Sequence, residues 1–159
     1  MEFFTTRFGE LSVSEDKVIN FPEGFIGLSA HDKFVIVADE SISPFIWFQS
    51  LVKSETAFLV IDPFLIMPEY EPLVSDEDLN TLGFKSKKEA QMYVVAIVSK
   101  DFREMTANFM APILVNMQLR KGLQTVLFNA DEYSARYDVL DRVDRLMEEN
   151  FVTSKESVL

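Results

Sequence analysis

The feature that most constrains the fold is a series of short β-branched or aromatic runs, each followed by a turn signal. Branched and aromatic side chains pack well on a pleated surface, so runs of this length are typical of strands. The prolines and glycines between the runs favour turns and interrupt central strands. The stretches that we predict as strands are 3–8, 17–21, 33–38, 45–51, 57–61 and 91–99, followed by a pair within 106–129.

Helical signals occur at two places only. Ser75 is typical of an N-cap, and the acids after it favour a short helix near 76–82 that ends at Gly83. From Glu132 onward the apolar residues recur every three or four positions, which predicts a C-terminal helix. Glu148 and Glu149 are unfavourable in a last helical turn, so we expect fraying near Asn150 and a disordered tail over 152–159.

Many short strands with one closing helix predict a mainly β chain, a small antiparallel β-barrel-like or sandwich domain. At 159 residues the chain is most simply one domain, which we place at 1–151, the C-terminal helix included.

Composition restricts the function classes. No apolar run approaches the roughly 20 residues that cross a bilayer, the N-terminus lacks signal-peptide features, and there is no cysteine, so we predict a cytoplasmic protein without a membrane segment. The net charge of −11 argues against direct nucleic-acid binding. It is compatible with a basic protein partner, or with an acidic surface that only maintains solubility.

The search for a reacting group finds little. The single histidine, His31, lies in a polar turn, zinc ligands are too few, and the five glycines do not form a phosphate loop. Asp76-Glu77-Asp78 lacks the spacing of a calcium loop. We therefore predict no enzyme, no catalytic residue, no cofactor and no metal; a hydrolase with paired carboxylates is the remote alternative.

One charge pattern stands out. Residues 54–84, called here the acidic segment, hold seven acids and no Lys, Arg or His. The segment also holds Phe64, Ile66, Met67 and Tyr70, which would serve as apolar contacts if they were exposed. Apolar anchors within one sign of charge favour a binding surface. The alternative is an ordinary long loop whose apolar residues enter the core.

Read together, these segments resemble the FliW family of flagellar assembly factors. The resemblance rests on INFPEGFIG (19–27), PFIWFQSL (44–51), AFLVIDPFLIMPEY (57–70) and TANFMAPILVNMQLRKGLQTVL (106–127), and it spans about Phe3 to Tyr137. Gly27-Leu28-Ser29 departs from the Gly-Phe-Glu usual in the family.

The resemblance implies a small β-barrel-like binding module without catalysis. Such proteins bind CsrA, a basic RNA-binding regulator that represses flagellin translation, and they also bind flagellin. Flagellin that accumulates would occupy the module and free CsrA to repress. A flagellin chaperone that never contacts CsrA is the main alternative.

The resemblance also assigns roles to segments. It implies that 106–129 is scaffold, in which Asn108 and Asn116 satisfy backbone groups; the residues themselves predict a hairpin turn at Lys121-Gly122. Flagellin would contact exposed parts of 21–27 and 44–51, with Phe25, Ile26 and Phe45 as candidates. The residues expected to face CsrA are Met67, Glu69, Tyr70, Glu71, Asp76, Glu77 and Asp78.

Overall fold

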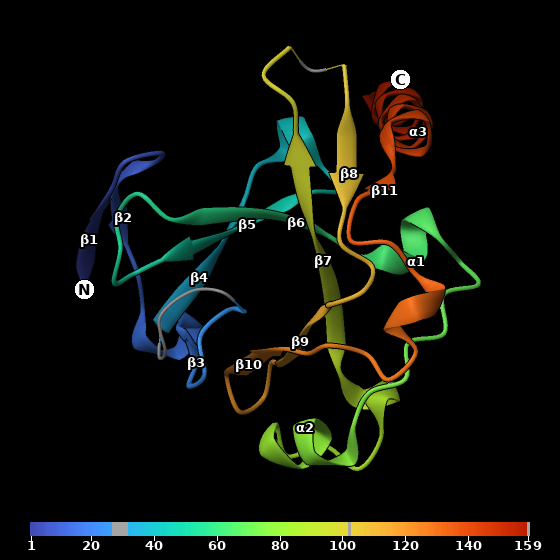
Figure 1. Ribbon diagram of the computed structural model, residues 1–159. Coiled ribbons are helices and arrows are strands. Elements are labelled where there is room, and N and C mark those ends of the chain that lie inside the picture. Colours follow the sequence, from blue (N-terminus) through green and yellow to red (C-terminus); the bar gives the residue numbers. More distant parts are fainter. Residues whose placement is uncertain (27–31, 102, 159) are drawn as a thin grey trace.

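Figure 1 shows the computed structural model, which describes residues 1–26, 32–101 and 103–158. Residues 27–31, which include the Gly27-Leu28-Ser29 departure and His31, lie outside the described part. The strands are β1 Glu2–Thr5, β2 Gly9–Ser12, β3 Ile19–Phe21, β4 Asp32–Ala38, β5 Ile46–Ser50, β6 Ala57–Ile61, β7 Gln91–Val98, β8 Met105–Ala107, β9 Ile113–Asn116, β10 Lys121–Gln124 and β11 Tyr137–Asp138. The α-helices are α1 Pro63–Ile66, α2 Asp76–Thr81 and α3 Leu140–Val158, and 3-10 helices span Glu15–Lys17, Glu40–Ile42, Lys87–Glu89 and Ala130–Glu132.

Strands β3 to β7, β9 and β10 close into a barrel. The pairing runs β7-β6-β5-β4-β3-β10-β9 and returns to β7. The first half of β7 pairs with β9 through Gln91, Met92 and Tyr93, and the second half pairs with β8. The predicted mainly β, barrel-like fold is therefore confirmed. It is not wholly antiparallel, because β10 and β3 pair in parallel where Lys121 meets Asn20.

Two local predictions about strands are wrong. The stretch 3–8 is not one strand: the chain turns after Thr5 and returns as β2, forming a two-stranded hairpin apart from the barrel (Figure 1). The Thr5 hydroxyl closes this turn by donating to the Gly9 carbonyl at 2.9 Å and accepting from the Phe8 amide at 3.0 Å. Gly9 has φ of 69°, a conformation that glycine adopts without strain.

The second wrong prediction is the turn at Lys121-Gly122, since both residues belong to β10. The chain turns at 117–120 instead, where the Asn116 Oδ1 accepts from the backbone amides of Gln118 and Leu119 at 3.1 and 3.0 Å. Asn108 likewise accepts two backbone amides, those of Met110 and Ala111. The predicted role of the two asparagines is confirmed.

Strand alternation divides the core into two layers. One set of side chains fills the barrel: Ile19, Phe21, Phe25, Phe34, Phe48, Val60, Ile113 and Val115. The intervening residues of β6, β7 and β9 point outward and are covered by helices and loops, as with Ile61, Val94 and Leu114. Because both faces of β9 and of the middle of β7 are buried, these strands read as nearly continuous apolar runs.

The predicted helices are present. Ser75 caps α2 by accepting from the Asp78 amide at 3.1 Å, and Gly83 follows with φ of 79°, a conformation suited to ending a helix. Helix α3 begins at Leu140 and not at Glu132, because a 3-10 helix ends at Glu132 and Tyr137–Asp138 form β11. It buries Val143 against the outer core layer. Helix α3 extends to Val158, beyond Asn150, where the sequence predicts fraying. The disordered tail over 152–159 and the domain limits of 1–151 stay predictions.

Candidate protein-binding surface

The part of the acidic segment that follows β6, residues 62–84, passes along the outside of the barrel through α1 and α2 (Figure 1). Asp62 begins this part by accepting from the Phe64 amide at 2.9 Å, which caps α1. Farther along, Asn129 accepts from the Leu73 amide at 2.9 Å and donates to the Glu71 carbonyl at 2.8 Å. The Tyr133 hydroxyl accepts from the Glu71 amide at 3.0 Å. These bonds give a stretch without strand structure a defined path.

Met67 and Tyr70 were predicted as exposed anchors, and this prediction is wrong: they are only 9% and 3% exposed. The Tyr70 hydroxyl donates to the Phe109 carbonyl at 2.6 Å, and its ring meets those of Phe109 and Tyr133 edge to face. Burial, with a smaller contribution from Tyr133, raises the pKa of Tyr70. Ile66 is buried too, whereas Phe64 is 41% exposed. Most apolar residues of α1 and its following turn therefore hold the segment on the barrel.

The acids of the segment do not form one cluster. Glu69, Glu71, Asp76 and Glu77 are exposed on the loop and on α2, so they are free to meet a partner. Asp78 is half-buried and accepts a hydrogen bond from the Thr125 hydroxyl, which gives it a structural role. Glu55 lies before β6 and Asp62 after it, so they stand at opposite ends of that strand.

Exposed apolar residues lie beside these acids at positions that the sequence reasoning missed. Leu73, Val126 and Phe128, called here the apolar patch, are 49%, 60% and 75% exposed. The Phe128 amide donates to the Leu73 carbonyl at 2.9 Å, which joins the two segments. Between the exposed pair lies buried Leu127, so the alternation along 125–128 marks an extended chain with one face outward. The sequence carries no matching signal, because 125–128 reads Thr-Val-Leu-Phe and the alternation is one of burial, which the fold sets.

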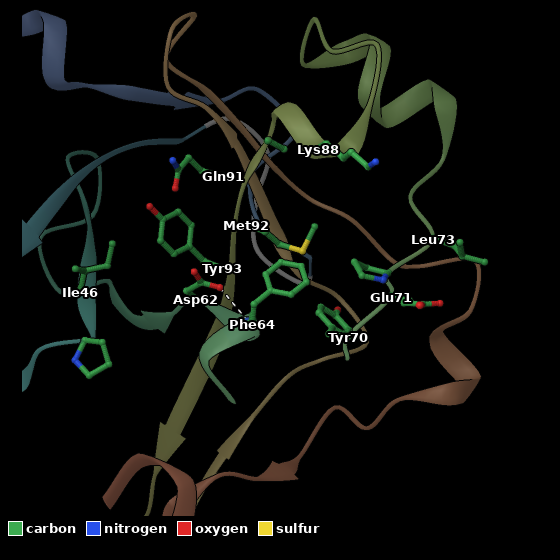
Figure 2. Close-up of a pocket in the computed structure, with 13 residues that line it drawn as sticks. Ile46, Asp62, Phe64, Tyr70, Glu71, Leu73, Lys88, Gln91, Met92 and Tyr93 are labelled. Carbon is green, nitrogen blue, oxygen red and sulfur yellow. Dashed lines mark hydrogen bonds between the residues drawn. The ribbon is translucent and has the colours of Figure 1, made fainter. Parts of the chain in front are cut away.

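A pocket of about 710 Å³ lies between α1, the following loop and the start of β7 (Figure 2). Asp62 and Tyr93 stand on one side of it, and Glu71 and Leu73 on the other. The rings of Phe64 and Tyr70, 5.8 Å apart between centroids, lie between the two sides. Burial, and then the negative charge of Asp62, raises the pKa of Tyr93. The pocket thus combines aromatic walls with carboxylates.

A second hollow, the apolar groove, has a volume of about 630 Å³ and is lined mainly by residues of β5, β6 and β7. Its lining includes Trp47, Ile97, Met105 and Met147, the last from α3. Ile97 is 65% exposed, and the Arg7 guanidinium lies 4.3 Å from the centre of the Trp47 ring. Such a groove suits the apolar face of a helix.

The residues predicted to meet flagellin have mixed outcomes. Phe25 is 4% exposed and packs inside the barrel against Phe21, Phe34 and Phe58, so it is not a surface residue. Phe45 is 3% exposed, although it contributes to the lining of the apolar groove. Ile26 is 55% exposed, as predicted.

The described residues contain neither a cluster of metal ligands nor a helix able to cross a membrane. Among the described residues, no three His, Cys, Asp or Glu side chains gather as a metal site would require. Within the same residues, every helix is too short or too polar to cross a membrane.

Comparisons with known proteins agree with this architecture. The family model described as "FliW protein" matches residues 2–139. The flagellar assembly factor FliW of Ruminiclostridium cellulolyticum is 34% identical over 142 residues, covering 89% of this chain and 95% of the relative. That of Syntrophus aciditrophicus is 35% identical over 147 residues and covers 92% of both chains.

A solved structure, titled as the crystal structure of the flagellar assembly factor FliW, superposes with a TM-score of 0.76 at 29% identity. It covers 87% of this chain and 94% of that chain. A family match over most of the length, with the same fold in a solved relative, shows that the chain belongs to the FliW family, whose named relatives are flagellar assembly factors.

Proposed function

We propose that this protein is a cytoplasmic, non-catalytic partner switch in flagellar assembly, which captures the basic regulator CsrA and is itself occupied by flagellin. Membership of the FliW family is the observation that carries the proposal. The net charge of −11 supports a basic partner and disfavours direct contact with nucleic acid. CsrA bound here would be prevented from repressing flagellin synthesis.

The proposed CsrA surface combines the exposed acids with the apolar patch. Glu69, Glu71, Asp76 and Glu77 supply negative charge, and Leu73, Val126 and Phe128 take the anchor role first assigned to Met67 and Tyr70. Apolar residues at the centre of an interface carry much of its binding energy. Carboxylates beside an RNA-binding surface repel phosphate over roughly the Debye length, about 8 Å at physiological salt.

The proposed flagellin site is the apolar groove, which would take one face of an amphipathic helix. Its lining includes the exposed Ile97 of β7 and the buried Phe45, which comes directly before β5. Among the described residues, the groove and the pocket beside the acidic segment share no lining residue. Flagellin and CsrA are thus assigned to different surfaces.

The first experiment is a calorimetric titration of this protein with CsrA, repeated after saturation with the cognate flagellin. Binding that disappears in the presence of flagellin would establish the partner switch. Binding to flagellin but never to CsrA would favour the alternative, a flagellin chaperone without a regulatory partner. Binding to neither protein would contradict both.

Two variants assign the surfaces. Glu69→Lys with Glu71→Lys should weaken CsrA capture and leave folding intact, because both side chains are exposed. Ile97→Glu places a charge in the apolar groove and should weaken flagellin binding only. An equal loss of affinity for both partners in either variant would contradict the assignment. So would unchanged CsrA affinity in the Glu69→Lys, Glu71→Lys variant.

A further inference from the structure

The pocket of Figure 2 has features that a flat acidic surface lacks. The pocket is open to solvent, and its volume of about 710 Å³ exceeds that of a single side chain. It can therefore receive one side chain of a partner together with part of the adjoining residues. Met92 and Ala90 belong to its lining beside Tyr93, and all three come from the start of β7 and the turn before it. A rigid strand therefore positions one wall of the pocket.

Asp62 is the carboxylate best placed to meet a ligand. One of its oxygens accepts from the Phe64 amide, but the side chain is exposed and each carboxylate oxygen has two lone pairs, so both oxygens can accept from a ligand. It lies between Phe64 and Tyr93 in Figure 2, and its charge acts on the Tyr93 hydroxyl. A carboxylate beside aromatic rings attracts a cation through its charge, and a ring adds to that attraction when the cation stacks on it.

Glu71 adds a second negative charge on the far side of the pocket, beyond Tyr70 (Figure 2). Among the described residues that line the pocket, Lys88 alone carries a positive charge. Its side chain is exposed and lies at the upper edge of the pocket in Figure 2. The charges of these three side chains sum to −1 when all are ionised. The pocket thus keeps an excess of negative charge, which Lys88 reduces.

We propose that this pocket binds an arginine side chain of the basic protein partner, with Asp62 as the ion partner and Phe64 and Tyr93 as the flanking rings. Arginine suits the pocket better than lysine because its planar guanidinium stacks on rings while donating two hydrogen bonds to one carboxylate. The inference rests on the proposed function for its partner, CsrA. It adds to the proposed function that the partner inserts an arginine side chain into this pocket.

The test uses Asp62→Asn, because asparagine also caps helices and so preserves α1 while removing the charge. Affinity for CsrA, measured by calorimetry, should fall about fivefold. Asp39→Asn is the matched control: Asp39 is an exposed N-cap as well, accepting from the Ser41 amide at 2.9 Å, and does not line the pocket. Lys88→Gln should tighten binding about twofold.

A second measurement separates this inference from the proposed function. Arginine amide added to the whole protein should shift the amide NMR signals of Met92 and Tyr93, and citrulline amide, which is neutral, should not. Shifts that disappear in Asp62→Asn would support the pocket even if CsrA never binds, a result that would overturn the proposed function alone.

Three results would overturn the pocket inference and leave the proposed function standing. The first is normal CsrA binding by Asp62→Asn. The second is an equal loss of affinity in Asp39→Asn, which would indicate a general effect of charge. The third is equal shifts from arginine amide and citrulline amide.

Discussion

At the scale of single residues, burial decides what each aromatic side chain does. Tyr70 and Phe128 are both aromatic and both lie near acids, yet one is 3% exposed and the other 75%. Tyr70 reaches Phe109, which is 39 residues away in sequence, and thereby fixes the loop after α1. Phe128 instead projects from the surface beside Leu73. The same residue type therefore supplies stability in one place and a contact surface in the other.

The Tyr70 hydroxyl makes stability depend on pH. Burial raises the pKa of Tyr70 in the folded protein above the value of about 10 that it has when unfolded. Above pH of about 10 the unfolded chain releases this proton first, so the free energy of unfolding should fall as pH rises. Tyr70→Phe should flatten this fall and, near pH 7, destabilise the protein by about 1–2 kcal/mol, because the Phe109 carbonyl loses its donor.

Urea titrations of both proteins from neutral pH upward measure this effect. Some pH dependence should persist in Tyr70→Phe, since burial also raises the pKa of Tyr93. Identical pH profiles for the two proteins would contradict the assignment to Tyr70.

Gly122 is a residue whose size matters more than its flexibility. A Cβ at this position would overlap the Phe21 ring inside the barrel, and that ring is fully buried. We expect Gly122→Ala to lower the free energy of unfolding by about 1–3 kcal/mol, as overpacking does. The neighbouring exposed change Lys121→Ala should stay within about 0.5 kcal/mol. Equal urea midpoints for the two variants would show that the barrel accommodates the added methyl group.

At the scale of elements, the loop between α1 and α2 depends on a few side chains for its path. Asn129 is 8% exposed and bonds to the backbone on both sides of Pro72, at Glu71 and at Leu73. It thereby positions Leu73 and Glu71 relative to each other. The order of this loop is therefore supplied by a residue from the other end of the chain.

We expect Asn129→Ala to destabilise the protein by about 1–3 kcal/mol, because the backbone groups at Glu71 and Leu73 lose their partner. Hydrogen exchange at the Leu73 amide should become faster, and CsrA affinity should fall with it. Asn80→Ala, an exposed change on α2, serves as the control and should alter neither. Unchanged exchange at Leu73 would contradict the positioning role of Asn129.

At the scale of the whole molecule, the net charge of −11 should govern how fast a basic partner arrives. Raising the salt concentration from about 0.01 M to about 1 M shortens the Debye length from about 30 Å to about 3 Å. The association rate with CsrA should therefore fall at least about tenfold, while the dissociation rate changes less. Stopped-flow kinetics across this range measures both rates. An association rate independent of salt would show that charge does not guide the encounter.

Local signals in the sequence predicted the elements well. Each of these signals involves residues only a few positions apart, so a short stretch of sequence is enough to recognise it. Examples are the N-cap at Ser75, the helix end at Gly83 and the apolar spacing along α3. The strands β3 to β7 match predicted runs to within one residue at their starts for the same reason, except that β3 begins two residues later. The predicted turn at Lys121-Gly122 is wrong because glycine here does not mark a turn. Gly122 lies in β10, where the Phe21 ring leaves no room for a Cβ.

By itself the sequence determined the mainly β class, the two main α-helices, the excess of acid in residues 54–84 and the resemblance to the FliW family. Only the tertiary structure decided that β7 closes the barrel on β9, that Met67 and Tyr70 are buried, and that Leu73 and Phe128 meet at the surface. The physical reason is the separation along the sequence over which each interaction acts. Propensity and capping act between neighbours in the chain, whereas exposure depends on which distant segments pack together, and a short window of sequence does not contain those partners.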